Sequence, residues 1–230
     1  MANSILKNNK QERLSKKVVP SELIDRKAYN LILGGVVLYG LIANLIICCL
    51  VPNVYVFINP LAFLLLYIVF CVCGCIMTAK SDNPIVSFIG YNLVVVPVGL
   101  VVSTSIDFYG GVGSAIVVQA FLVTSAITAV MIVASMLFPK AFEKLGGFLF
   151  VCLIAILVGS IVELFVGEII VLSWIAAVIF SLYIGYDFWK AQQYPATIDN
   201  AVDSALDIYL DIINLFLRLL RIIARSYSKK

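Results

Sequence analysis

The chain has 230 residues, of which 63% are hydrophobic and only 13% charged, and its formal net charge is +3. Soluble domains are about half apolar and about a quarter charged, so this composition excludes an ordinary water-soluble fold and predicts a membrane protein. The small net charge gives no indication of nucleic-acid binding. The chain contains no histidine, which excludes histidine-based triads and histidine-containing zinc sites.

Seven apolar runs follow a basic N-terminal arm, which we place at residues 1–28 and expect to lie in the cytoplasm near lipid. A helix needs about twenty apolar residues to cross the hydrocarbon core of a bilayer. The sequence therefore predicts an all-α, polytopic bundle of seven transmembrane helices in one membrane domain, residues 29–230. The predicted helices are 30–51, 56–79, 84–106, 113–138, 145–166, 168–189 and 201–224. Pro60 and Pro97 fall inside the second and third of these ranges, where proline tends to kink a helix.

Six cysteines lie inside the apolar runs, at Cys48, Cys49, Cys71, Cys73, Cys75 and Cys152. Disulfide frameworks and zinc sites place cysteines at turns with ligand spacing, a pattern that is absent here. Only Cys71 and Cys75 share a helix face among the three in the second helix. We interpret the cysteines as small apolar residues, with a soft-metal site as the alternative.

The distribution of lysine and arginine predicts a cytoplasmic N-terminus. With this orientation, eleven basic residues lie inside: Lys7, Lys10, Arg13, Lys16, Lys17, Arg26, Lys27, Lys80, Lys140, Lys144 and Lys190. The basic tail after the seventh helix breaks the pattern, because it lies outside if that helix spans the membrane. We favour a spanning helix, and an amphipathic helix in the membrane surface is the alternative. We expect no cleaved signal peptide and a bacterial inner membrane, or an intracellular membrane in a eukaryote.

The last helix carries a polar stripe along one face. At about 100° per residue, the stripe contains Asp203, Asp207, Asp211, Asn214, Arg218, Arg221 and Arg225. A charge in hydrocarbon is costly, so this face is expected to point into the bundle or a water-filled cavity. The preceding helix runs antiparallel to the last one, so its Asp187 can meet Asp207 or Asp211 at similar depth. Two carboxyls held close together share a proton or bind a hard cation such as calcium.

Further charged residues surround this predicted pair. Lys80, at the inner end of the second helix, is either a counter-ion for the acids or an anchor on the inner side. The acids Asp107, Glu163 and Glu168 lie at the outer ends of helices. They would either draw cations to an external mouth or are ordinary loop acids.

These last two helices resemble the Bax inhibitor family, also called the transmembrane Bax inhibitor motif family. The resemblance rests on Tyr-Ile-Gly-Tyr-Asp ending at Asp187, and on a motif formed by Tyr209, Leu210, Asp211, Asn214, Leu215 and Phe216. It implies a seven-helix bundle that leaks calcium through a gate of two aspartates, here Asp187 and Asp211. It also implies kinship with suppressors of cell death. Asp207 adds an acid that the family pattern lacks, and Lys80 stands near a position where some members carry arginine.

The sequence thus predicts a pH-sensitive calcium leak channel or exchanger, not an enzyme, with no cofactor and with calcium as the transported ion. Its partners would be the lipid bilayer, calcium ions and protons, with no nucleic acid; the sequence identifies no protein partner. Protonation would either weaken the calcium site or alter a proton-sharing latch, with opposite effects on flux. The alternatives are a non-transporting interaction protein, a proton-coupled small-molecule transporter and an intramembrane aspartyl protease. Against the protease alternative, the sequence lacks the Gly-x-Gly-Asp and Pro-Ala-Leu motifs that are typical of intramembrane aspartyl proteases.

Overall fold

The computed structural model describes residues 20–51 and 53–228, and every long element in this part of the chain is a helix. The all-α polytopic membrane fold is confirmed, and the long helices lie within a few residues of the predicted ranges. The helices are α2 (Arg26–Leu50), α3 (Pro60–Lys80), α4 (Pro84–Phe108), α5 (Ala115–Leu137), α6 (Pro139–Glu143), α7 (Gly146–Val166), α8 (Ile170–Ala191) and α9 (Ile198–Tyr227). Short 3-10 turns occur at Pro20–Glu22 and Val54–Val56. Residues 1–19 of the predicted N-terminal arm lie outside the described residues.

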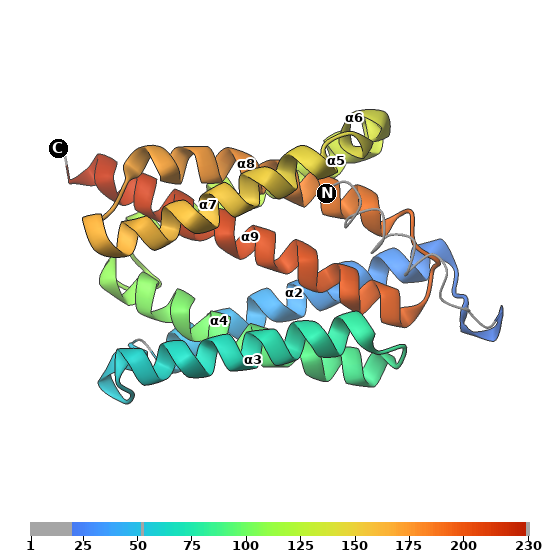
Figure 1. Cartoon of the computed structure of the whole chain (residues 1–230), viewed down its shortest axis with the longest axis horizontal. Helices are drawn as coiled ribbons and strands as arrows, with labels where there is room; N and C mark the ends of the chain where they lie inside the picture. Colours follow the sequence, from blue (N-terminus) through green and yellow to red (C-terminus); the bar gives the residue numbers. More distant parts are fainter. Residues whose placement is uncertain (1–19, 52, 229–230) are drawn as a thin grey trace. The chain divides into compact units, whose positions relative to one another are not determined.

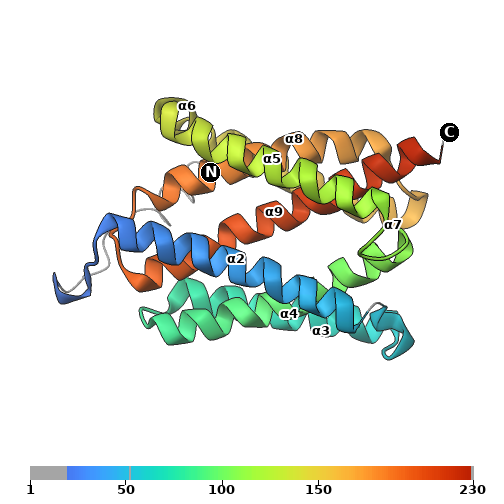
Figure 2. The same ribbon diagram turned by 180° about the vertical axis from the view of Figure 1, so that it is seen from behind.

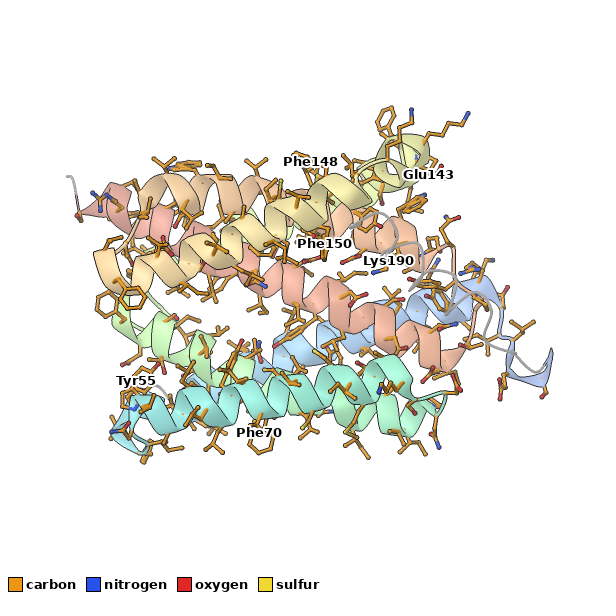
Figure 3. The ribbon with its side chains drawn as sticks, in the orientation of Figure 1. Tyr55, Phe70, Glu143, Phe148, Phe150 and Lys190 are labelled. Atoms are coloured by element: carbon orange, nitrogen blue, oxygen red, sulfur yellow. The ribbon has the colours of Figure 1, made fainter. Side chains whose placement is uncertain are left out.

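Six helices, α2, α3, α4, α5, α7 and α8, are long and apolar enough to cross a membrane. Large apolar side chains project outward from them, among them Phe70 on α3 and Phe148 on α7 (Figure 3). Such exposure is what a lipid-facing surface requires, because lipid replaces water around these side chains. The thirty-residue α9 is not one of the six, since four acids and three arginines lie along it.

Asparagine and aspartate side chains determine where several helices begin. Asp25 accepts a hydrogen bond from the backbone N–H of Lys27 at the start of α2. Asn59 and Asn83 cap α3 and α4 in the same way, and each is followed by a proline at the first helical position. Such a proline loses no helical hydrogen bond. The predicted kink at Pro60 was therefore wrong, because α3 begins at this residue, whereas Pro97 does lie inside α4.

The chain divides into two compact units, which we describe separately. The N-terminal unit contains Pro20–Val118 and Ala196–Tyr209, so that α2, α3 and α4 join the first part of α9. Helix α4 packs against both α2 and α3 (Figures 1 and 2). Gly74 and Gly90 bring α3 and α4 together so closely that a Cβ atom on Gly74 would lie 2.5 Å from the Gly90 carbonyl oxygen. No side chain larger than hydrogen fits between these backbones.

The C-terminal unit contains Gln119–Pro195 and the part of α9 from Leu210 onward. Helices α7 and α8 form a hairpin joined at Gly167, which has a φ of 87° that favours glycine (Figure 1). The short α6 packs against α8, where Phe142 contacts Gly185. Tyr186 fills the space above Gly146 of α7, where a Cβ atom would lie 2.5 Å from its hydroxyl. These contacts fix the end of α8 that carries Asp187.

Candidate functional site

The buried acid of α8 has a basic partner on the same helix. Asp187 lies near the C-terminal end of α8, and its side chain is 10% exposed. One turn later, Lys190 Nζ donates a hydrogen bond to Asp187 Oδ1 at 3.1 Å. Figure 3 shows Lys190 on this last part of α8. A buried carboxylate is costly unless it is paired, so this lysine stabilises the charged form of Asp187.

Asp211 of α9 belongs to the same unit as Asp187 and is also buried. Tyr183, one turn before Asp187 on α8, lies within electrostatic range of Asp187 and Asp211. Lys190 interacts with this tyrosine as well. The C-terminal unit therefore gathers both acids of the predicted pair around one tyrosine. Their role as a gate stays a prediction.

A second charged cluster connects α7 with α9. Arg218 donates from one guanidinium nitrogen to Glu163 Oε2 at 3.2 Å and from the other to Ser160 Oγ at 2.6 Å. Arg221 lies 3.4 Å from the same Glu163 oxygen. The other oxygen of Glu163 accepts the backbone N–H of Ile169 at 3.1 Å, just before α8. The acid that we predicted as part of an outer mouth is thus enclosed by its own partners.

The other acids of the polar stripe lie in the N-terminal unit, where Asp203 is buried and Asp207 is half-buried. Asp207 lies within electrostatic range of Cys75 on α3. Asp199, which the sequence interpretation did not select, accepts a hydrogen bond from Ser87 of α4 at 2.7 Å. Of the two α9 acids considered as partners of Asp187, only Asp211 belongs to its unit.

Neutral polar groups also join helices in the N-terminal unit. Asn44 of α2 donates to the Tyr209 hydroxyl of α9 at 2.8 Å, and both residues are buried. The Tyr91 hydroxyl of α4 donates to the Val36 carbonyl oxygen of α2 at 2.9 Å. Tyr209 belongs to the motif of the last helix, but its partner lies 165 residues away in the chain, so no local pattern indicates this bond.

The remaining predicted site residues lie at helix ends or make local contacts. Lys80 is the last residue of α3; it is exposed and forms no ion pair with any residue between 20 and 228 that the structure describes. Asp107 and Glu168 are exposed at the ends of α4 and α7. Asn214 donates to the Leu210 carbonyl oxygen on its own helix at 2.8 Å.

All six cysteines are free. Among the residues that the structure describes, no group of three or more cysteine, aspartate or glutamate side chains is arranged to hold a metal ion. Calcium usually binds six to eight oxygen atoms. Asp187 and Asp211 would therefore need water, hydroxyl or backbone oxygens to complete a calcium site.

The chain is a polytopic membrane protein, because six of its described helices are long and apolar enough to span a bilayer. Its interior contains ionisable side chains, such as those of Asp187 and Arg218. The family model described as inhibitor of apoptosis-promoting Bax1 matches residues 21–228. The chain therefore belongs to the Bax inhibitor family, as the motif around Asp211 indicated.

Relatives of the chain occur in bacteria and in a virus. An uncharacterised protein of Campylobacter jejuni is 36% identical over 121 residues, which cover 51% of each chain. An uncharacterised membrane protein of Streptococcus pyogenes is 36% identical over 48% of this chain and 52% of its own. The Golgi anti-apoptotic protein of vaccinia virus is 32% identical over 50% of this chain and 49% of its own. The chain spans about half the length of the curated relatives it matches.

Proposed function

We propose that this protein is a pH-sensitive calcium leak channel or exchanger whose gate contains Asp187 and Asp211. The observation that carries this proposal is the arrangement of two buried carboxylates around Tyr183 in a membrane domain. A buried ionisable group in a membrane domain is costly and commonly serves ion or proton passage. We further propose that the protein is not an enzyme and needs no cofactor, with calcium as its cargo.

The chemistry of the pair fits a hard divalent cation. Carboxylate oxygens are preferred calcium ligands, and only the deprotonated form binds the ion well. Lys190 places a tethered positive charge on Asp187, which a passing calcium ion would have to displace. Protons compete with calcium for the same oxygens. Flux is therefore expected above the pH at which the carboxylates titrate, and to fall as the pH decreases through it.

We propose a bacterial plasma membrane, with the N-terminus in the cytoplasm and α9 as the seventh span. Arg218 contacts the last turns of α7, and the Tyr227 hydroxyl donates to Gln119 Oε1 near the start of α5 at 3.3 Å. The positive-inside count assigns both of these helix ends to the outside. The C-terminal tail would then lie outside. Cleavage of a C-terminal tag by protease added to intact cells tests this orientation; full protection would contradict it.

Calcium uptake into liposomes that contain the purified protein tests the function. We expect flux that falls on acidification, and a decrease of about tenfold or more in Asp187→Asn and Asp211→Asn. Asp207→Asn is the matched control on α9 and should change flux by less than about threefold. Flux that rises on acidification would instead indicate a proton-sharing latch. Absence of flux at every pH, in protein that unfolds cooperatively on heating, would contradict the proposal.

A second candidate function is a membrane interaction protein that suppresses cell death. It is favoured by the name of the vaccinia virus relative, which describes that protein as anti-apoptotic. A stoichiometric partner recovered from the native membrane, together with absent calcium flux, would support this candidate. Proton-driven uptake of a small molecule without calcium flux would instead support a proton-coupled transporter.

A further inference from the structure

The Glu163 cluster of the C-terminal unit carries an excess of positive charge. Arg218 and Arg221 share a single carboxylate, so the three side chains together have a net charge of +1. The side chains of Arg218 and Glu163 are only 11% and 9% exposed, and that of Arg221 is 37% exposed. Solvent screens such partly buried charges weakly, so their field extends further than that of surface charges.

Hydrogen bonds fix the positions of the Arg218 and Glu163 side chains. Arg218 is bonded to both Glu163 and Ser160, on one face of α7. The backbone N–H of Ile169 orients the free oxygen of Glu163. Each oxygen of this carboxylate therefore has a donor, and α9 and the loop before α8 supply these donors. An arrangement with this many bonds is preorganised, and its charge stays fixed relative to the helices.

The cluster continues the face of α9 that carries Asp211. Arg218 and Arg221 follow Asp211 by seven and ten residues, which places them about 10 Å and 15 Å further along the helix axis. Seven residues correspond to about two turns, so the side chains project in similar directions. A cation that passed Asp211 and followed this face of α9 would therefore meet a net positive charge.

We propose that Glu163, Arg218 and Arg221 form an electrostatic seal that sets how readily cations pass the outer half of the C-terminal unit. This inference rests on the proposed function and adds residues that determine permeation. Arg218 and Arg221 repel cations, and Glu163 reduces the repulsion by compensating one of the two charges. The seal is opposite in sign to the acidic gate and lies about 10 Å further along α9.

The proposed seal predicts opposite effects on calcium flux when an arginine or the glutamate is neutralised. Arg218→Gln leaves Glu163 and Arg221, with a net charge of zero, and should increase calcium flux by about fivefold to tenfold. Glu163→Gln leaves two uncompensated arginines, with a net charge of +2, and should decrease flux by a similar factor. The double variant restores a net charge of +1 and should carry calcium within about twofold of the unsubstituted protein.

A merely structural role predicts a different result. Breaking the ion pair from either side would then shift flux in the same direction, and the double variant would be no better than either single variant. Thermal unfolding in detergent is measured alongside, because all three variants lose the Glu163–Arg218 ion pair and are expected to be less stable. Fluxes that follow the net charge of the cluster indicate the electrostatic role, whereas fluxes that follow the loss of stability indicate the structural role.

The experiment is calcium uptake at fixed pH into liposomes containing the full chain, with Arg225→Gln as control. Arg225 is exposed one turn beyond Arg221, so removing its screened charge should change flux by less than about twofold. Unchanged or parallel fluxes in Arg218→Gln and Glu163→Gln would overturn the seal while leaving the Asp187 gate intact. Flux in Arg218→Gln alone would support the seal and refute a leak in the unsubstituted protein. No flux in any variant would overturn both.

Discussion

The two units of this protein connect their helices by different chemistry. In the N-terminal unit, glycines bring α3 and α4 into backbone contact, and hydrogen bonds join α9 to α2 and α4, as at Asn44–Tyr209 and Ser87–Asp199. The C-terminal unit contains ion pairs. Glu163–Arg218 joins α7 with α9, and Asp187–Lys190 lies within α8. Neutral contacts are insensitive to cations, whereas a carboxylate can exchange its partner for a proton or a metal ion. Under the proposed function, the first set of contacts would hold the helices together and the second would respond to ions.

The largest expected effect is on the glycine contact. Gly74→Ala forces a Cβ atom to within 2.5 Å of the Gly90 backbone carbonyl oxygen, so α3 and α4 must move apart. We expect a loss of about 1–3 kcal/mol in the free energy of unfolding. Thermal unfolding in detergent micelles measures this loss. Gly34→Ala on α2 is the matched control, because nothing lies within 4 Å of its added Cβ atom, and it should not destabilise the protein.

A smaller effect is expected from the tethered cation of the acidic gate. Lys190→Gln removes the positive charge 3.1 Å from Asp187 Oδ1, so calcium no longer competes with it. The calcium concentration that gives half-maximal flux should fall by about threefold to tenfold. Lys144→Gln makes the same change of charge at an exposed position and should leave this concentration within about twofold. An equal response to both substitutions would show that Lys190 acts only through the general surface charge.

The smallest effect is expected from the neutral hydrogen bond. Tyr209→Phe removes the hydroxyl that accepts a bond from Asn44 Nδ2 and retains the aromatic ring. Interhelical hydrogen bonds in membrane proteins contribute about 0.6 kcal/mol on average, so we expect a modest decrease in thermal stability. Calcium flux per folded molecule should be unchanged, because no charge is altered. A large change in flux without a loss of stability would place Tyr209 in the permeation path and weaken the contrast between the units.

The sequence interpretation missed the ion pairs of the interior for two different reasons. The spacing of Asp187 and Lys190 at i,i+3 on one helix was visible in the sequence, yet Lys190 was interpreted only as an inner-side charge. Lys80 was considered as the counter-ion instead; it is exposed at the end of α3. The pairing of Glu163 with Arg218 joins residues 55 positions apart, and nothing near either one indicates the other.

The sequence by itself determined the class of protein, the positions of seven long helices and the polar face of α9. These follow from composition and period, because the bilayer requires long apolar helices and restricts charges to rare, regularly spaced positions. The tertiary structure decided which charges meet. Glu163 of α7 is paired with Arg218 and Arg221 of α9, and Asn44 of α2 is bonded to Tyr209 of α9. Such pairing depends on how helices distant in the chain pack against one another, and helical period specifies only which residues share a face.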